Sequence, residues 1–123
     1  MGTWFSYFND ANVRKALSLA IDRDYVANTI MQGTYSPAYN FMGPGWMDAA
    51  GTQFMDNANG GTTYISDDYA ANLEEAKRLL TEAGYPNGEG LPAITYSTNH
   101  RDTTSQLLNT YSRLGLNLVL MLL

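Results

Sequence analysis

A helical period of apolar residues near the N-terminus constrains the fold of this chain more than any other feature. Apolar side chains recur every three or four positions and therefore share one helix face: Val13, Ala16, Leu17, Ala20 and Ile21. Asp10 precedes this pattern and is expected to cap the first turn by accepting backbone N–H bonds. A second run follows from Tyr25 to Met31 and stops at Gly33. We expect one helix over residues 11–32, or two helices joined at Asp22, with one face in a core.

A further helix is predicted over NLEEAKRLLTEAG, residues 72–84. Asn72 is the expected cap, and Glu75 follows it by three residues, as in a capping box. The apolar stripe of this helix consists of Leu73, Ala76, Leu79, Leu80 and Ala83. Gly84 directly follows the stripe and is the expected C-terminal stop.

A strand, a helix and a strand are predicted after a turn-rich connection, YPNGEGLP. Residues 93–97, AITYS, alternate as a strand does. The next helix begins at Asp102 or Thr103 and stops at Gly115. The final residues, LNLVLMLL, are apolar on both faces and predict a central strand. A right-handed crossover between parallel strands is expected.

The start and the middle of the chain complete the expected order. Residues 3–8, TWFSYF, predict a short strand, and residues 33–66 show no clear period and predict a long loop. Loops of this length are often functional or belong to a larger assembly. The expected fold is α/β in the order β-α-loop-α-β-α-β, as a single domain over residues 1–123.

Composition excludes several classes of protein. The formal net charge of −5 argues against a nucleic-acid partner, which requires a basic surface. The absence of cysteine excludes disulfides, thiol catalysis and cysteine–zinc sites. No apolar run is long enough to predict a membrane span. The first ten residues do not show the pattern of a signal peptide, so none is expected in this chain.

Catalytic, metal and phosphate sites are not predicted. His100 is the only histidine, and no G-x-S-x-G nucleophile elbow occurs. A calcium loop starting at Asp56 fails, because Ala58 stands at its third position. The glycine-rich stretches lack the spacing of a phosphate loop. The charges at residues 74–78 are interpreted as a solvated helix face. We therefore expect no enzyme, no cofactor and no metal.

One local arrangement predicts ligand binding. Asn99, His100 and Arg101 stand where a strand ends and a helix begins. Open α/β sheets bind ligands at that edge, and a helix start offers free N–H groups. Arg101 adds a fixed cation with a planar set of donors. These residues predict a carboxylate receptor; alternatively, Arg101 only neutralises Asp102 or other nearby acids in water.

Four stretches together resemble one known family. They are NVRKALSLAIDRDYV, SPAYNFMGPG, EEAKRLLTEAGYPNGEGLPAITYSTN and LGLNL. Their order and spacing are similar to those of the extracellular solute-binding proteins of peptide ABC transporters, the oligopeptide- and dipeptide-binding family. The resemblance covers most of residues 9–119. It implies part of one lobe of a periplasmic-binding-protein-like (type II) fold, within the C-terminal half of a longer receptor.

The resemblance also implies a function for the intact parent protein. That protein would bind peptides outside the cytoplasm, in the periplasm or as a cell-surface lipoprotein, and deliver them to an ABC permease. Arg101 is the nearest match to the basic residue that reads the peptide carboxylate in dipeptide-type members, with His100 beside it. This chain alone is expected to bind peptide weakly or not at all and to associate with itself. The alternative is a free-standing α/β domain, a natural remnant or engineered, that has kept no ligand binding.

Overall fold

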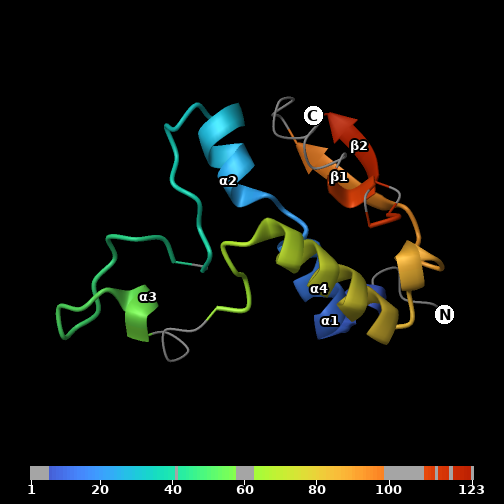
Figure 1. Cartoon of the computed structure of the whole chain (residues 1–123), viewed down its shortest axis with the longest axis horizontal. Helices are drawn as coiled ribbons and strands as arrows, with labels where there is room; N and C mark the ends of the chain where they lie inside the picture. Colours follow the sequence, from blue (N-terminus) through green and yellow to red (C-terminus); the bar gives the residue numbers. More distant parts are fainter. Residues whose placement is uncertain are drawn as a thin grey trace. The chain divides into compact units, whose positions relative to one another are not determined.

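The computed structural model describes residues 6–40, 42–57, 63–98, 110–112, 114–116 and 118–122 of the chain (Figure 1). The chain divides into two compact units. The first combines residues 1–22 with residues 68–123, and the second is the continuous segment 23–67.

The first unit is built on helix α1, Ala11–Leu19. The carboxylate of Asp10 accepts a hydrogen bond from the backbone N–H of Asn12 at 2.7 Å, which confirms the predicted cap. Val13, Ala16 and Ala20 of the predicted stripe are fully buried. Leu19 is buried as well, whereas Leu17 and Ile21 are only half-buried. The buried face is therefore rotated slightly from the predicted one, toward Leu19.

The predicted strand at residues 3–8 is wrong for the part that the structure describes. Ser6–Asn9 form a 3₁₀ turn that leads directly into α1. The Arg14 guanidinium donates hydrogen bonds to the backbone carbonyls of Phe8 and Asn9, the second at 2.9 Å. These bonds curl the segment back onto the helix start. Aromatic content alone suggested a strand, but the local bonds to Arg14 favour the turn.

Helix α4, Tyr69–Glu82, is longer at its start than predicted. Its cap is Asp68, whose carboxylate accepts from the N–H of Ala71 at 3.2 Å. The prediction that Asn72 caps this helix is wrong, because Asn72 lies within the first turns and is buried. An aspartate followed by Tyr-Ala-Ala supplies both a cap and helix-forming residues one turn earlier. The C-terminal stop is confirmed, because Gly84 has a φ of +90°.

Helices α1 and α4 lie side by side and form the core of the first unit (Figure 1). Ala76, Leu79 and Leu80 bury the inner face of α4. The Tyr69 hydroxyl donates to the Ala20 carbonyl at 3.1 Å, so the start of α4 is joined to the end of α1. The Tyr111 hydroxyl donates to the Leu17 carbonyl at 3.3 Å and joins the C-terminal part of the chain to the same helix.

A two-stranded parallel sheet completes this unit within the described residues. Strand β1, Ile94–Thr98, pairs with strand β2, Leu118–Leu122, in a register that runs from Ile94↔Leu118 to Thr98↔Leu122. Both strands were predicted within two residues of these bounds, and their parallel pairing is confirmed. Of the predicted helix between them, residues 110–112 are helical and residues 101–109 lie outside the described part.

The turns that precede the two strands are packed tightly together. A 3₁₀ turn at Pro86–Gly88 precedes β1, and a turn at Gly115 precedes β2. A Cβ atom added to Gly115 would lie 1.8 Å from the carbonyl oxygen of Asn87. A Cβ added to Gly88 would lie 2.7 Å from the carbonyl oxygen of Gly115. Only glycine at both positions permits this approach of two backbones.

The second unit begins with helical residues and continues as a long connection. Helix α2, Arg23–Tyr25, runs into a π-helical stretch, Val26–Ile30. The predicted helix is therefore divided at Asp22, in agreement with the two-helix alternative. The segment predicted as an unstructured loop contains a further short helix, α3, Phe54–Asn57, and a small hairpin before it.

The predicted order β-α-loop-α-β-α-β is not confirmed. The described chain begins with a 3₁₀ turn, and two strands are described where three were expected. No helix among the described residues is both long and apolar enough to cross a lipid bilayer.

Candidate functional site

The predicted carboxylate receptor lies beyond the part of the chain that the structure describes. Asn99, His100 and Arg101 follow directly after β1, whose last residue, Thr98, pairs with Leu122 of β2. The structure thus describes the parallel strand from whose carboxyl end these residues continue. The edge beyond the carboxyl ends of parallel strands is where open α/β sheets bind ligands.

Exposed apolar side chains are concentrated in the second unit. Within the described residues, six of the seven large hydrophobic side chains that are exposed belong to it: Tyr25, Tyr35, Trp46, Met47, Phe54 and Tyr64. Tyr35, Trp46 and Met47 are the most exposed, at 63%, 62% and 61%. Scattered apolar residues are normal on a protein surface, but a set along one segment is typical of a contact surface.

Trp46 and Met47 are presented by a small hairpin, residues 46–54. The backbone N–H of Phe54 donates to the Trp46 carbonyl, and that of Asp48 donates to the Thr52 carbonyl, each at 2.8 Å. The N–H of Gly51 donates to the Asp48 carbonyl at 3.1 Å and closes the tight turn. Gly51 has a φ of +79°, the left-handed conformation that glycine adopts readily in hairpin turns.

The Asp48 carboxylate holds this hairpin together. One of its oxygens accepts from the N–H groups of Ala50 and Thr52, at 2.8 and 3.0 Å. The other accepts from the Thr52 hydroxyl at 2.7 Å and from the Asn57 amide at 2.8 Å. These bonds, those from Thr52 foremost, lower the pKa of Asp48 to about 2. The carboxylate is therefore charged at every physiological pH and fixes the loop that carries Trp46 and Met47.

Sequence reasoning missed this hairpin. The signal was available in residues 48–52, which read Asp-Ala-Ala-Gly-Thr. Aspartate at the first position of a turn and glycine at the fourth position favour a hairpin. The absence of a period over the surrounding loop concealed it.

A second polar contact orders the beginning of the long connection. The Tyr39 hydroxyl donates to the Asp24 carboxylate at 2.7 Å, and the Thr63 hydroxyl donates to the Tyr39 carbonyl at 2.9 Å. The bond to Asp24, followed by burial and nearby charges, raises the pKa of Tyr39. Tyr39 therefore connects residues near both ends of the segment within its own unit.

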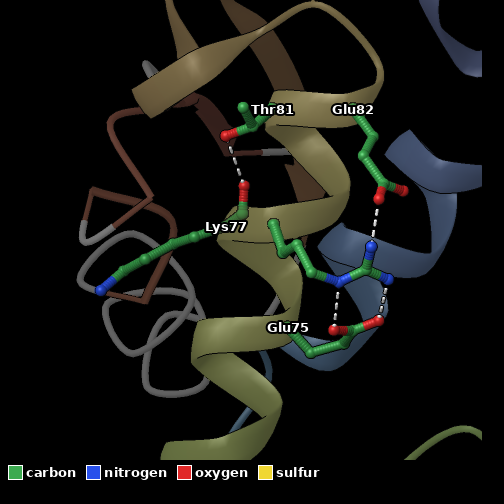
Figure 2. Close-up of polar contacts among 5 residues, drawn as sticks. Glu75, Lys77, Thr81 and Glu82 are labelled. Atoms are coloured by element: carbon green, nitrogen blue, oxygen red, sulfur yellow. Dashed lines mark hydrogen bonds and ion pairs between the residues drawn. The ribbon is translucent and has the colours of Figure 1, made fainter.

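The outer face of α4 carries charged side chains that pair with one another (Figure 2). Arg78 donates to Glu75 through two nitrogens, at 2.6 and 2.7 Å, and a third nitrogen contacts Glu82. Lys77 pairs with Glu74 at 2.6 Å. All of these side chains are exposed, and the pairs lower the pKa of Glu75 and raise that of Arg78. The expectation of a solvated helix face is confirmed.

No group of three metal-ligating side chains occurs in the described parts of the chain. Of the calcium loop rejected from the sequence, which would start at Asp56, residues 58–62 lie outside the described part of the chain.

Comparison with known proteins identifies a family. The model of the bacterial extracellular solute-binding proteins, family 5 (middle region), matches residues 5–115. The periplasmic oligopeptide-binding protein OppA of Escherichia coli is 37% identical over 93 residues, which are 75% of this chain and 16% of that protein. Heme-binding protein A of Haemophilus influenzae is 34% identical over 82 residues, 66% of this chain and 12% of that protein.

A solved structure shows the same fold. The periplasmic oligopeptide-binding protein of an oligopeptide ABC transporter from Borrelia burgdorferi superposes with a TM-score of 0.65 and 25% identity. The superposition covers 100% of this chain and 23% of that protein. The present chain thus spans less than a quarter of the length of each protein that it matches here.

Proposed function

Because this chain belongs to the bacterial extracellular solute-binding proteins of family 5, we propose that it is one segment of a receptor that binds peptides for ABC-type uptake. The match to the family model over most of the chain carries this proposal. Members of the family are binding proteins rather than enzymes, and we extend that to this segment. Its relatives named as periplasmic support an extracytoplasmic location for the intact receptor.

The segment alone should bind peptide weakly. A receptor that closes two lobes around a peptide uses contacts from both, and this chain spans about 16% of its oligopeptide-binding relative. If half the contacts of a micromolar site are absent, about 8 kcal/mol becomes roughly 4, which corresponds to a millimolar constant.

Calorimetry of the isolated chain with a mixed pool of short peptides tests this expectation. Titration should give no more heat than dilution at micromolar peptide. Hemin serves as the comparison ligand, because one relative is named for binding heme. A micromolar constant for the peptides would overturn the proposal that the segment needs the rest of a receptor.

We further propose that Arg101, with His100 and Asn99 beside it, reads the peptide carboxylate in the intact receptor. The support is positional: β1 is parallel to β2 and ends at Thr98, immediately before these residues. A guanidinium at a helix start combines a fixed cation with free N–H groups, both suited to a carboxylate.

A double-mutant cycle tests the role of Arg101. The aligned segment of the E. coli oligopeptide-binding protein is replaced by this chain, and Arg101→Ala is combined with peptide acids and peptide amides. The substitution should weaken binding of the acid by about 1.5–3 kcal/mol. It should have little further effect on the amide, since both changes remove one contact. Additive effects would show that Arg101 does not read the carboxylate.

The same chimera distinguishes the alternative function. A folded chimera that retains peptide binding supports a receptor segment. A folded chimera that binds no peptide favours a free-standing domain that has kept the fold and lost the ligand.

A further inference from the structure

The turn before β1 contains the pair Asn87–Gly88, a sequence prone to spontaneous deamidation. The Gly88 backbone nitrogen attacks Cγ of Asn87, the new N–Cγ bond closes a five-membered succinimide, and the side-chain nitrogen leaves as ammonia. The proton lost from the Gly88 N–H passes to solvent. Water then opens the ring to aspartate or isoaspartate. Glycine favours this attack, because it has no Cβ to hinder the approach.

The backbone of the turn opposes this reaction. Ring closure requires the Gly88 nitrogen to eclipse Cβ of Asn87. Asn87 has φ 53° and ψ 24°. At this ψ the Gly88 nitrogen nearly eclipses the backbone nitrogen of Asn87, and it therefore lies on the side away from Cβ. The Gly88 N–H also donates to the Tyr85 carbonyl at 3.0 Å, so the attacking group is already hydrogen-bonded.

Packing against Gly115 prevents the turn from rotating into a reactive geometry. The Asn87 carbonyl oxygen lies where even a methyl group on Gly115 would come within 1.8 Å of it. Gly88 is buried beneath the same contact, with its own Cα facing the Gly115 carbonyl. A rotation of ψ at Asn87 moves its carbonyl oxygen, so the reactive geometry requires the contact with the turn at Gly115 to change.

We propose that Asn87 is a conformationally protected deamidation site, which reacts only when the contact between the two turns opens. The isoaspartate product routes the main chain through Cβ and lengthens it by a methylene. The lengthened turn no longer fits against Gly115, so a chain that has reacted cannot rebuild the junction from which β1 and β2 start. The amount of isoaspartate formed from Asn87 therefore reports how often the contact between the two turns has opened.

Peptide mapping by mass spectrometry tests the proposal on the full chain. Protein is incubated at mildly alkaline pH, with and without urea at an unfolding concentration, and conversion at Asn87 is followed over time. The Asn87 rate in buffer should be about tenfold or more below its rate in urea, which corresponds to at least about 1.4 kcal/mol of opening free energy. Equal rates would overturn the proposal.

Two controls define the result. The pair Asn59–Gly60, which lies outside the described residues, is mapped in the same urea digests and should react there at a rate similar to Asn87. If Asn87 is slow even in urea, the protection is not conformational and the proposal fails.

The variant Gly115→Ala, whose added Cβ overlaps the Asn87 carbonyl, should raise the Asn87 rate in buffer toward the urea value. If this variant folds and Asn87 remains protected, packing against Gly115 is not the cause; if it does not fold, the comparison in buffer and urea decides.

Discussion

The titration of the Asp48 carboxylate tests the role of this single residue in the hairpin. Its hydrogen bonds lower its pKa from 3.8 to about 2. A lowered pKa in the folded state means that the charged form stabilises the hairpin. This contribution is complete above about pH 4 and is lost as the pH falls through about 2. We expect the Asp48 carboxyl carbon to titrate with a midpoint near 2 by NMR, with loss of amide protection at Thr52 and Phe54 over the same range.

The variant Asp48→Asn is the matched control for this titration. It keeps the shape of the side chain, but its NH₂ group faces the Asn57 amide donor. Protection at Thr52 should be reduced at every pH, and the acid transition should disappear. A midpoint near the ordinary aspartate value in the wild type would contradict the role assigned to Asp48.

Predictions for single residues succeeded where the determining contacts are local. Asp10 was identified as a cap because its partner, the N–H of Asn12, is two residues away. Asn72 was misassigned because Glu75 follows it by three residues, as in a capping box, and Asp68 was not considered. The cap is Asp68, and Asn72 lies in the core. Asp68 is followed by Tyr-Ala-Ala, so the earlier start was also available from local sequence, and the burial of Asn72 agrees with it.

The two faces of helix α4 are expected to contribute differently to stability. Leu80 is 1% exposed and packs in the core with α1, whereas Arg78 on the outer face contacts glutamates in water. We expect Leu80→Ala to lower the free energy of unfolding by about 2–5 kcal/mol, as for other large-to-small core substitutions. Urea unfolding followed by far-UV circular dichroism measures this difference.

Arg78→Ala is the control on the same helix. Its pairs with Glu75 and Glu82 are solvent-exposed, and such pairs contribute little to stability. The urea midpoint should therefore change little, and only slightly more at low salt. A loss as large as that of Leu80→Ala would mean that the outer face of α4 is covered in the folded chain.

Whole elements were predictable in proportion to their periodicity. The two longer helices and β1 follow from apolar spacing, because spacing determines which face can be buried. Strand β2 follows from a continuous apolar run, which is typical of a central strand. The first strand was predicted from aromatic composition without a pairing partner, and Arg14 bonds that segment into a turn instead. The hairpin at 46–54 was missed because its stability comes from one carboxylate rather than from a repeated pattern. The predicted ligand residues 99–101 remain a prediction.

For the whole molecule, the exposed apolar residues of the second unit predict self-association. Trp46 and Met47 present their side chains from an ordered hairpin and remain more than half exposed. Light scattering over a concentration series should show an average mass that rises with concentration. The double variant Trp46→Gln with Met47→Gln should reduce this rise, since it removes the apolar surface and keeps the hairpin bonds.

Tyr96→Ser provides the comparison from the first unit, where Tyr96 is an exposed aromatic on β1. It should leave the concentration dependence unchanged. A monomeric wild-type chain at high concentration, or an equal effect of both variants, would contradict a contact surface on the hairpin.

The hydrogen bond between Tyr69 and Ala20 also has an evolutionary consequence. Segment 23–67 leaves the first unit close to Ala20 and returns to it close to Tyr69, so this bond joins the two ends of the segment. A segment whose two ends lie next to each other can be lengthened, shortened or exchanged without a change in the positions of α1 and α4. The geometry therefore permits related chains to differ in segment 23–67 while α1 and α4 stay the same.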